Sequence, residues 1–134
     1  MTDPTVTVDR VVPDGGERVE PRKTLRRYYD RVDANDVDGL LSLFAADIRY
    51  ERPGQGVIEG RDELRTFYER DRPLEDGSHE IYEILVDGSS ASVRGTFSGR
   101  LDGDPVSFGF ADHHRFDADG LITARYTFTD RDSV

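Results

Sequence analysis

Residues 106–129 read VSFGFADHHRFDADGLITARYTFT, which is the pattern of a β-hairpin with one carboxylate on its apolar face. Every second residue of the first strand lies on that face: Val106, Phe108, Phe110, Asp112, His114 and Phe116. Asp119-Gly120 then forms a two-residue turn. Continued alternation predicts that the return strand turns these side chains inward: Ile122, Ala124, Tyr126 and Phe128. Its outward side chains would be Thr123, Arg125, Thr127 and Thr129.

Asp112 is the residue of this hairpin that needs an explanation, because a carboxylate on an apolar face is costly to ionise. It must be paired with a cation, be hydrogen-bonded, or have a raised pKa and act as a neutral donor. The arginines that could pair with it are Arg52, Arg94 and Arg125. We favour the neutral donor, since perturbed acids cluster on concave functional surfaces.

The bulk composition restricts the class of protein. A chain of 134 residues fits one domain with a single core or a small internal pocket. It contains no cysteine, which excludes a disulfide framework and thiolate chemistry and is compatible with a cytoplasmic location. No apolar run has the length of a membrane span, and no signal-peptide pattern is present, so we expect a soluble, cytoplasmic protein.

The charge balance indicates which partners to exclude. With 28 acidic and 18 basic residues the formal net charge is −10, so nucleic acid and anionic membranes are not expected as partners. Lys23 is the only lysine. Acidic, lysine-poor surfaces resemble those of proteins from halophilic archaea, and we interpret the acidity as adaptation to salt. The histidines follow no metal-binding spacing, so we expect neither a metal nor a cofactor.

The N-terminal half is expected to be helical after an appended arm. Residues 1–20 are polar and form either a flexible tail or an edge strand, and the domain spans 21–134. A helical stripe follows at Leu25, Tyr28, Tyr29 and Val32. Asp36 caps a second helix with apolar positions Val37, Leu40, Leu41 and Phe44. A short strand at 48–52 places Ile48, Tyr50 and Arg52 on one face, and a third helix spans 61–72.

The C-terminal half is expected to be a meander of strands. Its turn signals are Asp87-Gly88, Asp102-Gly103 and Asp119-Gly120. In the strand at 91–101, Gly95 and Gly99 fall on the apolar face, where they indicate a bend. Helices followed by a long antiparallel meander predict an α+β fold. We expect a cone in which three N-terminal helices pack on a strongly curved, mostly antiparallel sheet and enclose a pocket that Asp112 faces.

Three stretches resemble the nuclear transport factor 2-like superfamily, especially its SnoaL-like and ketosteroid isomerase-related members. They are YYDRVDANDVDGLLSLFAADIRYERPG at 28–54, IEGRDELRTFY at 58–68 and FADHHRFDADGLI at 110–122. The resemblance covers nearly the whole chain apart from the arm. This fold is used by isomerases, cyclases, hydrolases, dehydratases and binding modules. The resemblance therefore indicates the fold, and it is weak evidence for any single activity.

The resemblance implies roles for three residues. Asp112 falls where ketosteroid isomerases have a protonated aspartic acid that donates to the enolate oxygen. Tyr28 falls where the family has a tyrosine that is the other donor to this oxygen. Tyr68 matches a tyrosine that in some members hydrogen-bonds the tyrosine at the position of Tyr28. The family base is an aspartate in the string E-D-P, but this chain reads Glu51-Arg52-Pro53, and an arginine cannot abstract a proton.

Two interpretations accommodate Arg52. In the first, Arg52 binds an anionic group of the substrate and His114 is the base. In the second, Arg52 pairs with an ionised Asp112 and the pocket only binds. The expected catalytic residues are Asp112, Tyr28 and His114. The expected substrate-binding residues are Arg52, Tyr68, Tyr50, Phe108, Phe110 and Phe116.

Two classes of function follow from this pattern. The first is a cofactor-independent isomerase, cyclase or lyase that stabilises an enolate-like oxyanion of a small hydrophobic molecule, with or without an anionic group. The second is a non-catalytic binding or dimerisation module of the same fold. In either case we expect a homodimer, paired through the outer face of the sheet at Arg94, Ser98, Thr123, Thr127 and Thr129.

Overall fold

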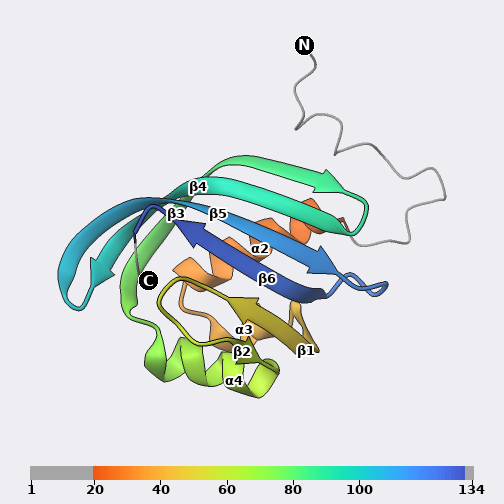
Figure 1. The fold of residues 1–134 in the computed structure, drawn as a ribbon, viewed down its shortest axis with the longest axis horizontal. Coiled ribbons are helices and arrows are strands. Elements are labelled where there is room, and N and C mark those ends of the chain that lie inside the picture. Colours follow the sequence, from red (N-terminus) through yellow and green to blue (C-terminus); the bar gives the residue numbers. More distant parts are fainter. Residues whose placement is uncertain (1–19, 132–134) are drawn as a thin grey trace, which may run out of the picture.

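The computed structural model describes residues 20–131, which form an α+β fold built on one curved sheet (Figure 1). The helices are α2 (Pro21–Asp33), α3 (Val37–Leu41), α4 (Arg61–Thr66) and the π-helical turn η1 (Phe67–Asp71). The strands are β1 (Phe44–Glu51), β2 (Ile58–Glu59), β3 (Leu74–Asp87), β4 (Ser90–Leu101), β5 (Asp104–Phe116) and β6 (Ile122–Thr129). The predicted α+β class is therefore confirmed, whereas a cone with three N-terminal helices stays a prediction. The arm predicted at 1–20 lies outside the described residues, apart from Glu20.

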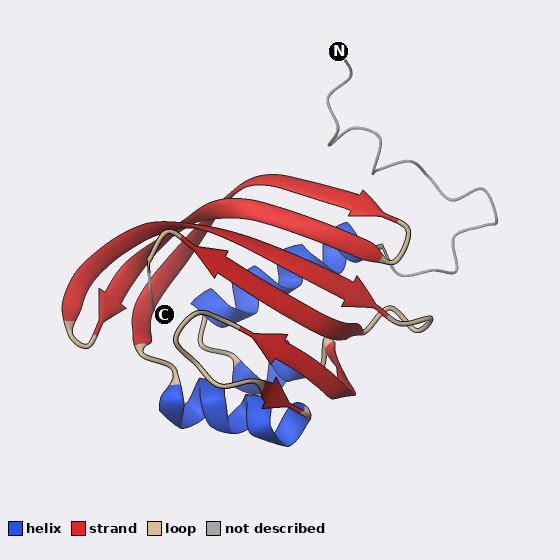
Figure 2. Ribbon diagram, in the orientation of Figure 1, coloured by secondary structure: helices blue, strands red, loops and turns tan. Residues whose placement is uncertain are grey.

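The six strands form a single sheet in the order β2-β1-β6-β5-β4-β3. All the neighbouring pairs are antiparallel except β1 and β6, which run parallel. Helix α2 packs against β3 and β4, and α4 packs against β1. Figure 2 shows how strongly the long strands bend. No helix within residues 20–131 combines the length and apolar character needed to cross a membrane.

The helices form where the apolar stripes predicted them. Along α2 the buried residues are Thr24, Leu25, Tyr28, Tyr29 and Val32, and Pro21 occupies the first turn, where its missing N–H costs nothing. The carboxylate of Asp36 caps α3 by accepting from the backbone N–H of Gly39 at 2.9 Å. Phe44, predicted as the last apolar position of that helix, instead begins β1. The third predicted helix is α4 followed by η1, and π-helical turns often occur at functional sites.

All three Asp-Gly signals lie between consecutive strands of the β3–β6 meander, as predicted. At the β4–β5 turn both Asp102 (φ 52°) and Gly103 (φ 88°) are left-handed, the geometry of a type I′ hairpin turn. After β5 the carboxylate of Asp117 accepts from the N–H groups of Asp119 and Leu121, each at 2.9 Å. These local bonds hold the loop that joins β5 to β6.

Gly95 lies where β4 approaches β3 too closely for a side chain. A Cβ at this position would lie 2.2 Å from the backbone oxygen of Glu80 and 3.0 Å from the ring of Phe110. We expect Gly95→Ala to lower the free energy of unfolding by about 1–3 kcal/mol, because overpacking forces the strands apart. Urea denaturation measures the change. Gly56→Ala is the matched control, since nothing lies within 4 Å of its Cβ position, and equal stabilities of the two variants would contradict the close approach.

The alternation predicted for β6 is wrong after its first residue. Phe116 pairs with Ile122, but Arg115 pairs with Ala124, so β6 contains one extra residue, Thr123, at this point. Such a bulge shifts the phase of the strand and turns each following side chain to the other face. Arg125 is therefore buried, and Phe128, predicted inside, is 62% exposed. Periodicity alone does not reveal a bulge, which is why the prediction failed.

Candidate functional site

Asp112 is 1% exposed and forms the centre of a buried polar cluster. Its carboxylate accepts hydrogen bonds from Arg125 Nη2 at 2.8 Å, Thr127 Oγ1 at 2.7 Å and the Tyr29 hydroxyl at 2.5 Å. Burial by itself would raise the pKa of this carboxyl, but Arg125 and the hydrogen bonds outweigh it and lower the pKa to about 2. The raised pKa predicted for Asp112 is therefore wrong. The carboxylate is ionised, and its cation is Arg125 rather than Arg52.

Arg125 is 4% exposed and joins the acid to the tyrosines. Its Nη1 donates to the hydroxyls of Tyr28 and Tyr68, the latter at 3.1 Å. The guanidinium also lies over two rings, 4.4 Å from the centroid of Tyr28 and 4.7 Å from that of Tyr50. The charge of Arg125 is thus neutralised by Asp112, and its guanidinium is held in one position by aromatic neighbours.

Tyr50 lies between two guanidiniums at the end of β1. Its side chain is buried, and its hydroxyl accepts from Arg52 Nη1 at 2.9 Å and contacts Thr127 Oγ1 at 3.4 Å. Burial raises the pKa of this phenol, but the charges of Arg125 and Arg52 together lower it below its usual range. Arg52 itself is 8% exposed and lies 4.8 Å from the ring centroid of Phe67. The predicted inner face of this strand is confirmed.

A cavity opens beside this cluster on the concave face of the sheet. The empty space between its walls, counting the part that is open to solvent, is about 330 Å³. The residues that line it are Tyr28, Tyr50, Arg52, Arg72, Leu74, His79, Phe97, Phe108, Phe110, Asp112, Arg125, Thr127 and Thr129. The lining therefore combines aromatic rings with charged and hydroxyl groups.

Comparison with known families identifies the domain. A profile described as "SnoaL-like domain" matches residues 25–125. The chain belongs to the SnoaL-like domain family.

Solved structures show the same fold. A candidate SnoaL-like polyketide cyclase from Jannaschia sp. CCS1 superposes with a TM-score of 0.74 at 16% identity, covering 90% of this chain and 92% of that one. A LEH-like epoxide hydrolase from M. tuberculosis gives 0.74 at 22% identity, covering 85% of each chain. A hypothetical protein with a ketosteroid isomerase-like fold from Catenulispora acidiphila, bound to trimethylamine, gives 0.71 at 19% identity, covering 79% and 84%. At these identities the likeness concerns the fold.

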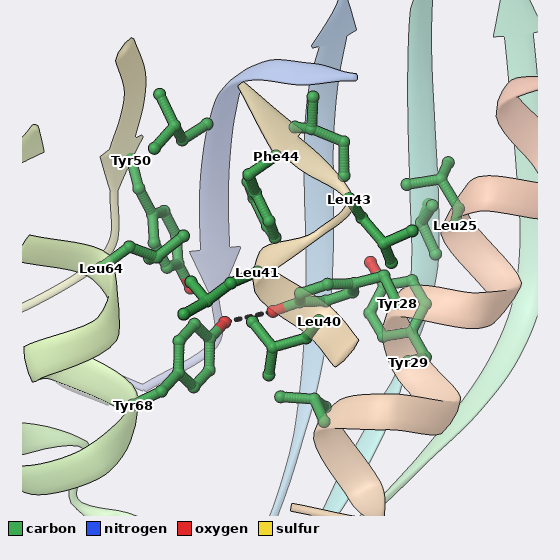
Figure 3. Packing of buried hydrophobic residues seen from close by; sticks show 14 of the residues in the cluster. Leu25, Tyr28, Tyr29, Leu40, Leu41, Leu43, Phe44, Tyr50, Leu64 and Tyr68 are labelled. Atoms are coloured by element: carbon green, nitrogen blue, oxygen red, sulfur yellow. Dashed lines mark hydrogen bonds between the residues drawn. The ribbon is translucent and has the colours of Figure 1, made fainter. Parts of the chain in front are cut away.

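The two tyrosines to which the resemblance gives roles in this SnoaL-like domain contact each other. The hydroxyls of Tyr28 and Tyr68 are hydrogen-bonded, as Figure 3 shows. Tyr28 lines the cavity, whereas Tyr68 lines a neighbouring groove between α3 and the start of β3. Burial raises the pKa of both phenols, that of Tyr28 well above its usual value, so both are neutral at pH 7.

His114 and Phe116 lie deeper in the SnoaL-like core than we expected. Neither lines the cavity, and His114 is fully buried with its Nε2 3.4 Å from the Tyr29 hydroxyl. Burial and the charge of Arg125 lower the pKa of His114 to about 3. It is a neutral core imidazole that tilts against the ring of Phe116, with ring centroids 6.4 Å apart. This position gives it no contact with a molecule in the cavity.

Several lining residues were missed by the sequence analysis. Arg125 and Thr127 were placed outside because of the bulge. Arg125 was nevertheless among the arginines named as possible partners of Asp112, because a buried acid needs a cation. Arg72 follows η1, and His79 lies on β3, a strand for which no pattern had been assigned. Within residues 20–131, His, Cys, Asp and Glu side chains form no group of three or more that could hold a metal ion.

Proposed function

We propose that this SnoaL-like domain is a cofactor-independent enzyme that transfers protons on a small hydrophobic molecule and stabilises negative charge on one of its oxygens. An isomerase, cyclase or lyase reaction has this requirement. The observation that supports the proposal is Tyr50, a phenol with a lowered pKa on the cavity wall, between Arg52 and Arg125. Arg52 can only donate, so the phenol proton is available to an oxygen of the ligand.

The cluster around Tyr50 is preorganised for this role. A donor that is already oriented and sits in a site with little water stabilises developing charge without reorganisation. In this proposal Asp112 stays ionised and holds Arg125, and Tyr28 accepts from Arg125 while lining the cavity. The proton donor is therefore Tyr50, in place of the neutral Asp112 that the family resemblance implies.

The names of the structural neighbours are consistent with such chemistry. They include a candidate polyketide cyclase and an epoxide hydrolase. Opening an epoxide and enolising a ketone both place negative charge on oxygen. The alternative, a non-catalytic binding module, is favoured by Arg52 standing at the position of the family base.

We also propose a homodimer through the outer face of the sheet, where Tyr82 is 50% exposed and Phe128 is 62% exposed. Thr127 and Thr129, which were predicted to lie on the dimer face, instead line the cavity on the inner face of the sheet.

A phenol probe tests the proton-donating site. We expect 4-nitrophenol to bind in the cavity as the phenolate, which absorbs visible light, because its oxygen mimics an enolate. Tyr50→Phe should weaken this binding about 10–100-fold, the effect of losing one hydrogen bond to a charged group. Tyr82→Phe, which removes an exposed hydroxyl of the outer face, is the matched control. Equal affinities of Tyr50→Phe and the wild-type protein would refute the role of Tyr50.

A further inference from the structure

His79 is the one imidazole among the residues that line the cavity. It lies on β3 opposite Phe97 of β4, and its side chain is 9% exposed. Three aromatic rings surround it, with centroids at 5.2 Å for Tyr29, 5.1 Å for Phe97 and 5.3 Å for Phe110. These contacts restrict the orientation of the imidazole, and His79 is one of the residues that line the cavity.

Asp33, the last residue of α2, holds His79 at two atoms. Its Oδ2 accepts from the backbone N–H of His79 at 2.9 Å, and its Oδ1 lies 2.5 Å from Nδ1 of the ring. A carboxylate can only accept, so Nδ1 carries the proton of the neutral imidazole and Nε2 carries a lone pair. In the part of the chain that the structure describes, Nε2 has no hydrogen-bond partner and is not fully buried.

The surroundings keep this imidazole neutral near pH 7. Burial lowers the pKa of His79, and the charge of Arg72 lowers it further, while Asp33 and Asp112 raise it. The charged and titratable groups around the ring come from α2 (Asp33 and Tyr29), from the residue after η1 (Arg72) and from β5 (Asp112). A neutral imidazole with an oriented lone pair is the form that accepts a proton.

We infer that His79, oriented by Asp33, is the general base of the cavity, so that the base comes from β3 and not from the end of β1, where Arg52 stands. The inference rests on the proposed function, whose proton donor is Tyr50. Nε2 takes a proton from the carbon next to the carbonyl of a small ketone. The electrons of that C–H bond form the C=C bond of the enolate, and the carbonyl π electrons move to the oxygen, which Tyr50 stabilises. The imidazolium, paired with Asp33, then returns a proton to carbon, and in D₂O it delivers a deuteron once its Nε2 proton has exchanged with solvent.

Deuterium exchange into a small ketone measures this step directly. We expect the full-length protein to catalyse exchange of the α-protons of 2-indanone in D₂O, followed by proton NMR. His79→Gln should lower the rate about 100-fold, as is typical for removal of a general base, and Asp33→Asn about tenfold. The wild-type rate should level off at a lower pH than it would with an imidazole of ordinary pKa, because burial lowers the pKa of His79. His113→Gln, on the outer face, and Asp30→Asn, exposed on α2, are matched controls.

Binding of 4-nitrophenol separates the two proposals. If His79→Gln binds 4-nitrophenol like the wild-type protein but loses exchange, the base is His79. If His79→Gln exchanges as fast as the wild-type protein, or if the wild-type protein binds 4-nitrophenol and does not accelerate exchange, the inference about His79 is wrong and the site at Tyr50 stands. If the wild-type protein neither binds 4-nitrophenol nor accelerates exchange, both proposals are wrong.

Discussion

Replacing Arg125 with methionine should lower the free energy of unfolding at pH 7 by about 3–5 kcal/mol, the range for breaking a buried ion pair from one side. The reason is the state in which the variant leaves Asp112. That carboxylate is 1% exposed, and without Arg125 it keeps only the hydrogen bonds of Tyr29 and Thr127. Urea denaturation measures the loss. Arg115→Met, an exposed arginine on β5, should change stability by less than about 0.5 kcal/mol.

The double variant Arg125→Met/Asp112→Leu shows whether the loss comes from the unpaired charge. Removing both partners leaves no buried ion, so the double variant should be more stable than Arg125→Met alone. A double-mutant cycle gives the coupling between the two side chains. Additive effects would mean that Asp112 and Arg125 do not interact as charges, and a neutral Asp112 would then have to be considered again.

Asp112→Asn should also destabilise the protein at pH 7, by about 3 kcal/mol, because it leaves Arg125 buried without its anion. The effect depends on pH with a definite sign. The pKa of Asp112 is lowered to about 2 in the folded state, so folding is favoured by the ionised form. Its contribution, about 2–3 kcal/mol, is fully present above the unfolded pKa of about 3.9 and is lost as the pH falls through the folded pKa.

Denaturation of wild-type and Asp112→Asn protein at a series of pH values tests this sign. The difference in stability should be constant from pH 7 to about 5 and shrink between about pH 4 and 2. Asp104→Asn, which replaces an exposed aspartate at the start of β5, is the control and should leave the wild-type dependence of stability on pH unchanged. If Asp112→Asn were instead as stable as the wild-type protein at pH 7, the carboxyl would be neutral in the folded protein.

Much of the fold can be predicted from the sequence because local signals determine it. The apolar stripe that includes Tyr28 and Tyr29 positions α2. Asp36 caps α3, because its carboxylate accepts a hydrogen bond from a backbone N–H of the first turn. The glycine of each Asp-Gly pair adopts the left-handed conformation that these turns require, so the pairs locate three strand boundaries. At Gly95, where the sequence indicated a bend, a side chain would meet the backbone carbonyl of Glu80.

The candidate site was predicted less well, because it depends on contacts between distant segments. A single extra residue, Thr123, reverses the face of Arg125 and so changes the cation that Asp112 meets. A guanidinium in contact with the buried carboxyl decides whether the pKa of Asp112 rises or falls. Likewise His79 is unremarkable in sequence, and its pairing with Asp33 across 46 positions appears only when α2 packs on β3.

The most direct test of the central claim, that Asp112 is a charged anchor for Arg125 and not the proton donor, is a titration of its carboxyl carbon by ¹³C NMR, assigned by comparison with Asp112→Asn. We predict a carboxylate signal at pH 7 and an inflection near pH 2. An inflection above about pH 5 would show a neutral carboxylic acid under mildly acidic conditions, and it would return the donor role from Tyr50 to Asp112.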